Sequence, residues 1–67
     1  MEIITLNYTN KELTLYKIDG LYKACVCNIK GRITIARYEE YKIEDMIKRL
    51  EYHDIKLCKC CLEQLND

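Results

Sequence analysis

Residues 13–35 read LTLYKIDGLYKACVCNIKGRITI, and this stretch decides the fold because it holds both glycines of the 67-residue chain. Each glycine closes a similar triplet, Ile18-Asp19-Gly20 or Ile29-Lys30-Gly31. Such triplets suit three-residue hairpin loops, in which a type I turn is followed by a glycine in the left-handed region. Apolar and polar residues alternate around both loops with the period of two that is typical of strands. The stretch therefore predicts three consecutive antiparallel strands.

The loop length decides which side chains share a face, because a shift of one residue turns a whole strand over. With three-residue loops, Cys25 faces Leu13 and Ile35, and Cys27 faces Ile33. Two-residue loops would instead turn both cysteines to the other side. We prefer three-residue loops because they keep one face apolar throughout. The predicted core face then comprises Ile4, Leu6, Leu13, Leu15, Leu21, Cys25, Cys27, Ile33 and Ile35.

A further strand precedes this stretch. Asn10-Lys11 suits a two-residue loop, and it would pair Leu6 with Leu15. This first strand is an outer strand of a simple meander. It therefore offers an edge to a partner strand, or to a second copy in a homodimer.

Helical spacing begins after the strands, from about Ile43 to Leu50, and the apolar side of this helix would cover the core face. The pattern falters at His53. We expect a break there, followed by a last helical turn or two from about Lys59 to Leu65. A single helix that runs to the C-terminus is the alternative. The predicted fold class is α+β: a four-stranded antiparallel meander with a C-terminal helix, whole or broken, packed on one face.

Length and composition indicate a single small domain over residues 1–67. Lysine and arginine number 11, as do aspartate and glutamate, so the net charge is zero. This balance removes the simplest argument for a nucleic-acid binder. We expect a cytoplasmic protein without membrane contact, because the sequence contains no export signal or long apolar run. Abundant Lys, Ile, Tyr and Glu without Pro, Trp or Phe are typical of A+T-rich genes, including those of phages.

The five cysteines fall into two groups, Cys25-x-Cys27 and Cys58-x-Cys60-Cys61. Residues i and i+2 of a strand point the same way, and C-x-x-C spacing lets two thiolates approach one ion. Zinc prefers four such ligands in a tetrahedron. The candidate zinc ligands are Cys25, Cys27, Cys58 and Cys61. The preferred interpretation is that cysteines pack as small apolar residues and that no cofactor is bound.

The segment from Leu57 to Leu65, LCKCCLEQL, resembles the second knuckle of treble-clef zinc fingers. In that family an apolar residue precedes C-x-x-C, and the second cysteine opens a short amphipathic helix. The resemblance covers nine residues and implies a structural zinc. The other pair, Cys25 and Cys27, lies in a predicted strand instead of a turn.

No constellation of catalytic residues is evident, so we expect the protein not to be an enzyme. Serine is absent, and the two glycines are needed for turns rather than for a phosphate-binding loop. The adjacent acidic residues Glu39-Glu40 and Glu44-Asp45 diverge on a strand or a helix, which does not suit a paired acid and base.

The sheet face opposite the predicted core is aromatic and smooth. Tyrosine and arginine are enriched at interface hot spots because they bury much area and keep a polar group. The alternative is that β-branched and aromatic residues merely suit strands. The candidate partner-binding residues are Tyr16, Tyr22, Val26, Arg32, Thr34 and Tyr38.

Two functional hypotheses follow. The first is a non-enzymatic protein–protein interaction module, an adapter or small inhibitor of a host protein. It would be encoded by a phage or mobile element, for example for counter-defence. The second is a zinc-stabilised nucleic-acid-binding protein whose tyrosines stack on bases. Zero net charge favours a protein partner.

Overall fold

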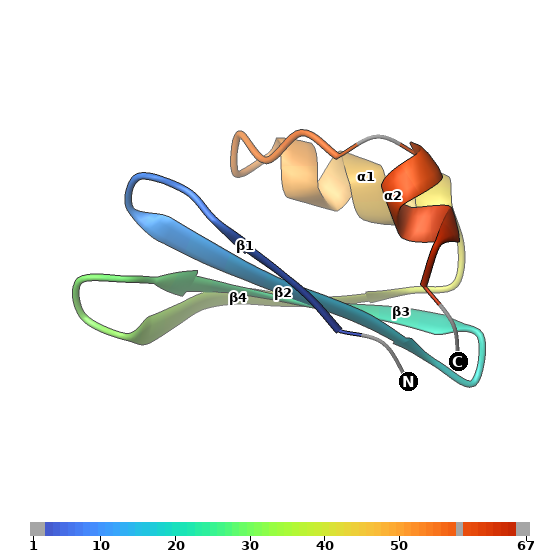
Figure 1. Cartoon of the computed structure of the whole chain (residues 1–67), viewed down its shortest axis with the longest axis horizontal. Coiled ribbons are helices and arrows are strands. Elements are labelled where there is room, and N and C mark those ends of the chain that lie inside the picture. The colour runs from blue at the N-terminus through green and yellow to red at the C-terminus, as the bar shows by residue number, and fades with distance from the viewer. Residues whose placement is uncertain (1–2, 58, 66–67) are drawn as a thin grey trace.

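A computed structural model of the chain describes residues 3–57 and 59–65, with only the backbone at Cys61 (Figure 1). Four strands and then helical segments follow one another: β1 (Ile3–Asn7), β2 (Lys11–Ile18), β3 (Leu21–Asn28), β4 (Ile33–Glu40), α1 (Ile43–Glu51) and α2 (Lys59–Glu63). The strands form one antiparallel sheet in the order β1-β2-β3-β4. The predicted meander followed by helix is confirmed. β1 lies at an edge of this sheet, and its pairing with a second copy stays a prediction.

The first hairpin differs from the predicted one by two residues. The backbone N–H of Tyr8 donates to the Lys11 carbonyl over 2.8 Å, which closes the loop. Leu6 therefore pairs with Leu13, and the predicted pairing of Leu6 with Leu15 is wrong. Because strand side chains alternate with a period of two, an error of two residues leaves the same side chains on the same face.

The second hairpin differs by one residue, which matters more. Ile18 pairs with Leu21, so the loop holds only Asp19 and Gly20. Their φ angles of 51° and 79° place both in the left-handed region. This is the type I′ turn that Asp-Gly favours, because its twist matches that of the flanking strands. The predicted three-residue loop is wrong, and β3 is turned over relative to the prediction.

The third turn, in contrast, is longer than predicted, since Asn28 pairs with Ile33, and it is not closed by its glycine. Among the described residues of this turn, Arg32 has the positive φ, 53°. The Asn28 side-chain oxygen accepts hydrogen bonds from the backbone N–H groups of Lys30, over 2.9 Å, and Gly31, over 3.3 Å. An asparagine that bonds the backbone ahead of it in this way initiates the turn.

The reversed β3 changes its partners in β4 as well. Cys25 pairs with Arg37 and Cys27 with Thr34, and a register shift between Val26 and Cys27 leaves Ile35 as an extra residue in β4. The predicted pairings of the two cysteines with Ile35 and Ile33 are wrong. Both isoleucines are exposed, at 45% and 67% respectively, so their predicted place in the core is also wrong.

The core lies between one face of the sheet and the helical segments, which Figure 1 shows on the same side of the sheet. Residues from β2, β3, α1 and the C-terminal segment meet there. Of the predicted core face, only Leu13 and Leu15 are fully buried, while Ile4 and Leu6 pack against the core from the edge strand. The buried side chains are Leu13, Leu15, Tyr22, Ala24, Val26, Met46, Leu50, Ile55, Leu62 and Leu65.

Helix α1 combines an apolar side with a favourable distribution of charge. Met46 and Leu50, four residues apart, are both fully buried. Acidic residues occupy the first turn of α1 and basic residues the last turn, which complements the helix dipole. In the described part of the chain, no helix combines the length and apolar character needed to cross a bilayer.

The Asp19-Gly20 turn leads to a first prediction. Replacing Gly20 with alanine should lower the free energy of unfolding by about 1–2 kcal/mol, because an L-residue is strained at positive φ. A Cβ at this position would meet no atom within 4 Å, so the loss is conformational rather than steric. Urea denaturation followed by circular dichroism measures the change.

Gly31→Ala is the matched control. Its Cβ would approach the Ile33 Cδ1 to 3.2 Å, but that atom is the far end of an exposed side chain that can move aside. We expect a change within about 0.5 kcal/mol. A larger loss for Gly31→Ala than for Gly20→Ala would contradict the two turns described above.

Candidate functional site

We call the sheet face that points away from the helices the open face. Three rows of cross-strand neighbours cross all four strands on it, and the pair Ile18 and Leu21 lies beyond them at the end of the β2–β3 hairpin. The strand pairings assign to the open face Ile3, Tyr16, Lys23 and Glu39 in one row, Thr5, Thr14, Cys25 and Arg37 in the next, and Asn7, Glu12, Cys27 and Thr34 in the third.

Two of the predicted partner-binding residues lie on this face and two lie in the core. Tyr16 and Thr34 are on the open face. Tyr22 and Val26 are buried on the opposite face, with exposed fractions of 5% and 0%. Their predicted exposure is wrong because the two-residue Asp19-Gly20 loop turns β3 over. The predicted partner-binding residues therefore do not lie together on one surface.

The other two predicted residues also lie elsewhere. Tyr38 is the neighbour of the buried Ala24, so it belongs to the helix-covered face. A hydrogen bond of 2.6 Å joins its hydroxyl to Nε2 of His53, and the Arg49 guanidinium lies 5.7 Å from its ring centre. Arg32 lies in the β3–β4 turn. Tyr38 therefore does not contribute to the open face, whereas Arg32 borders a second hollow at its margin, together with Glu12 and Cys27.

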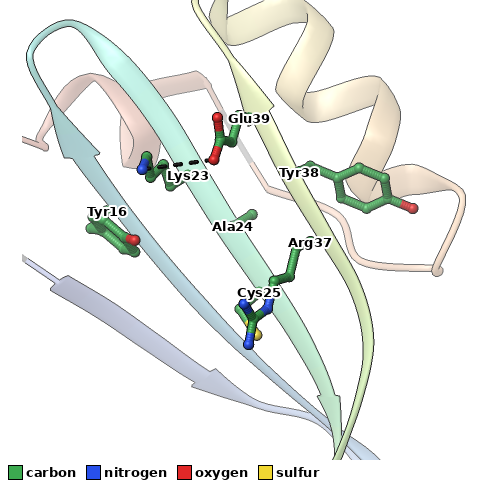
Figure 2. A pocket seen from close by; sticks show the side chains of 7 residues that line it. All are labelled: Tyr16, Lys23, Ala24, Cys25, Arg37, Tyr38 and Glu39. Atoms are coloured by element: carbon green, nitrogen blue, oxygen red, sulfur yellow. Dashed lines mark ion pairs between the residues drawn. The ribbon is translucent and has the colours of Figure 1, made fainter.

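A shallow hollow lies over β2, β3 and β4 on the open face, and Figure 2 shows its side chains. Tyr16 borders it from β2. Lys23 of β3 forms an ion pair with Glu39 of β4, with 3.7 Å between Nζ and Oε1. Arg37 extends from β4 toward Cys25, whereas Tyr38 points away toward the helices. The hollow therefore brings an aromatic ring, a guanidinium and a thiol together.

The charges of the open face balance. On its strands, Lys23 and Arg37 are the described basic residues and Glu12 and Glu39 the acidic ones. Arg32 adds one further basic side chain at the margin, from the β3–β4 turn. The two lysines of β2 lie on the helix-covered face. Lys11 Nζ donates to the His53 carbonyl over 2.8 Å, and Lys17 Nζ lies 5.2 Å from the Tyr22 ring centre. The face therefore has mixed charge without a basic groove.

The thiols of Cys25 and Cys27 lie side by side on the open face. Their Sγ atoms are 3.5 Å apart, and Thr34 Oγ1 is 3.9 Å from the sulfur of Cys27. Both cysteines are free and half-buried. The hydrogen bond with Cys25, reinforced by burial, raises the pKa of the Cys27 thiol. Cys27 is therefore held in its thiol form more firmly than an ordinary cysteine.

The structure describes the side chains of only the first group of candidate zinc ligands, Cys25 and Cys27. Cys25 and Cys27 were predicted to project into the core, and this is wrong. Helix α2, which contains Cys61, lies on the other side of the sheet (Figure 1). Cys58 and the Cys61 side chain lie outside the described residues. Within the described part of the chain, no group of three or more His, Cys, Asp or Glu residues could hold a metal ion.

Several open-face residues were not predicted from the sequence, and Arg37 is the one that brings a guanidinium beside Cys25. The signal that identifies it is the Asp19-Gly20 dipeptide, the strongest short-range mark of a two-residue hairpin loop. With that loop, the alternation of β3 turns Cys25 outward, and the pairing with β4 brings Arg37 beside it.

Comparisons of the chain with protein-family models, with curated proteins and with solved structures give no match.

Proposed function

We propose that the chain is a non-enzymatic protein–protein interaction module, an adapter or small inhibitor that binds its partner through the open face. One observation carries the proposal. No described element covers the open face, whereas the helical segments and the core cover the opposite face (Figure 1). A flat sheet face that presents Tyr16 beside Arg37 offers the two residue types most enriched at interface hot spots.

Charge balance favours a protein over a nucleic acid as the partner. Proteins that stack single-stranded bases combine aromatic side chains with a basic groove that follows the phosphates. On the open face the two basic residues are offset by Glu12 and Glu39, and Lys23 is already paired with Glu39. A partner of mixed charge, with a carboxylate opposite Arg37 and apolar surface opposite Tyr16, would match this face.

The chemistry of the open face supports binding rather than catalysis. A cysteine nucleophile acts as the thiolate, and the raised pKa of Cys27 disfavours that form. His53 could serve as a base, but it bonds to Tyr38 on the helix-covered side of the sheet. The carboxylate of Glu12 lies opposite Cys27 on the open face, and its negative charge further raises the pKa of that thiol instead of favouring the thiolate.

Affinity capture with matched variants tests the proposal. The full chain is immobilised and exposed to a lysate of the cells that express it, alongside Tyr16→Ala and Arg37→Glu. The proposal expects a captured protein whose binding falls about 10-fold or more in both variants, because each removes a central contact. The captured protein is then purified, and its affinity for each variant is measured.

Tyr52→Ala is the control, since Tyr52 is exposed and follows α1 on the helix-covered side. It should capture as much partner as the unaltered chain. Circular dichroism establishes that all variants fold. Equal capture by every variant would contradict the proposal. So would capture of nucleic acid with a steep salt dependence, which reports phosphate contacts.

A further inference from the structure

We propose that Cys25 and Cys27 form a bidentate site for a soft, thiophilic metal ion of the Cu(I) class on the open face. The site goes beyond the protein-binding function proposed above and does not depend on it. Both side chains project from the same side of β3, because residues i and i+2 of a strand point the same way. Soft thiolate ligands select ions such as Cu(I) over hard cations.

The distance between the two sulfur atoms suits chelation. Metal–thiolate bonds are about 2.3 Å long, so two sulfurs on one ion lie about 3.8 Å apart at a tetrahedral angle and about 4.6 Å apart in a linear arrangement. The Sγ atoms of Cys25 and Cys27 are 3.5 Å apart. Small rotations about the side-chain bonds would therefore bring them to either separation.

The scaffold holds the two thiols in place before any ion binds. β3 is an inner strand, paired with β2 on one side and β4 on the other. The strand that carries the thiols is thus fixed by hydrogen bonds on both sides, which lowers the entropic cost of binding. Both thiols are half-buried on the uncovered face of the sheet, so an ion can reach them from solvent.

The number of donors favours Cu(I) over zinc. A structural zinc site takes four protein ligands, but the described part of the chain groups no third His, Cys, Asp or Glu side chain with these two thiols. The neighbouring oxygen of Thr34 is a neutral hydroxyl, 3.9 Å from the Cys27 sulfur. Cu(I) accepts low coordination numbers with sulfur, and a dithiolate alone can satisfy it.

Binding balances as a proton exchange without electron transfer. Two S–H bonds break, two protons leave to solvent, and two copper–sulfur bonds form, while copper remains Cu(I). The complex carries one negative charge. Arg37, the cross-strand neighbour of Cys25, can offset it, whereas Glu12, the cross-strand neighbour of Cys27, opposes it. Because the ion must displace protons, its apparent affinity should rise with pH.

An anaerobic titration with Cu(I) tests the site. The reduced full chain carries Cys58→Ser, Cys60→Ser and Cys61→Ser, so that only the open-face thiols remain, and a chromophoric Cu(I) chelator serves as competitor. We expect about one ion per chain and an ultraviolet Cu(I)–thiolate absorption band. Adding either Cys25→Ser or Cys27→Ser should weaken binding about 100-fold or more, since each removes half of the chelate.

Arg37→Gln and its matched control Lys23→Gln each remove one positive charge from the open face, and comparing them tests the role of Arg37 in Cu(I) binding. Arg37→Gln should weaken binding about 10-fold, as loss of an outer-shell partner does, and Lys23→Gln should have a smaller effect. If the triple-serine chain does not fold, the full complement of cysteines is titrated instead. Cys25→Ser/Cys27→Ser must then bind about one ion fewer. Unchanged affinity or stoichiometry after removal of Cys25 and Cys27 would overturn the proposal.

Discussion

Val26→Asp is expected to unfold the chain. The Val26 side chain is fully buried between the sheet and the helices. An aspartate there would have to bury a carboxylate without a partner or take up a proton, at a cost of several kcal/mol. A 67-residue domain has a total stability of about 3–10 kcal/mol at the usual value per residue, so most of it would be lost. Circular dichroism and amide NMR spectra should report an unfolded chain.

Cys25→Asp, one residue earlier in the same strand, is the control. Cys25 is half-buried on the open face, and its cross-strand neighbours are Thr14 and Arg37. A carboxylate there stays in contact with water and faces a guanidinium, so the free energy of unfolding should change by about 1 kcal/mol or less. A folded Val26→Asp together with an unfolded Cys25→Asp would reverse the two faces of the sheet.

Leu62→Ala is expected to lower the free energy of unfolding by about 2–5 kcal/mol. Helix α2 has five residues, which is far too short to be stable alone in water. Its place therefore depends on packing, and Leu62 and Leu65 are buried in the core. The Lys59–Glu44 ion pair, with 3.0 Å between Nζ and Oε1, joins exposed side chains and adds little. Urea denaturation measures the loss.

Glu63→Ala controls for helix propensity in the same turn. Glu63 is exposed, and the change should be within about 0.5 kcal/mol. If Leu62→Ala lowered the free energy of unfolding as little as Glu63→Ala, the C-terminal segment would not contribute to the core. The description of the helix-covered face would then be wrong.

The sequence was sufficient for the order of elements and for one half of the core. Alternation over the first 38 residues predicts the four strands, and the helical spacing from about Ile43 to Leu50 predicts the helix that follows them. Leu6, Leu13 and Leu15 share a face as predicted although the predicted first loop is wrong, because its register differs by two residues and an even shift keeps each side chain on its face. Local pattern is informative wherever apolar residues occur on only one face of a strand.

β3 lacks such a one-sided pattern, and this explains the main error. Ala24 and Val26 alternate with Cys25 and Cys27, so both faces of the strand are apolar. Hydrophobic periodicity then cannot choose between them, and only the turn can. The two glycine triplets look alike, yet Gly20 adopts a positive φ, while in the next turn Arg32 does so.

The wrong orientation of β3 also made most of the predicted binding surface wrong. Tyr16 stayed on the open face because the first hairpin differs from the predicted one by an even number of residues. Thr34 stayed there because the register shift at Ile35 cancels the reversal of β3 at the start of β4. Tyr22 and Val26 moved into the core with the reversal of β3, and Arg37 came out beside Cys25. A one-residue change in a single loop thus replaced most of the predicted binding surface.

The register of the β2–β3 hairpin is the claim on which the open face and the dithiol site both depend. Interstrand backbone NOEs in the isotopically labelled full chain measure it directly. The structure predicts NOEs that pair Leu13 with Val26 and Leu15 with Ala24 across the Asp19-Gly20 turn. NOEs pairing Leu13 with Cys25 would contradict it, and would return both cysteines to the helix-covered side of the sheet.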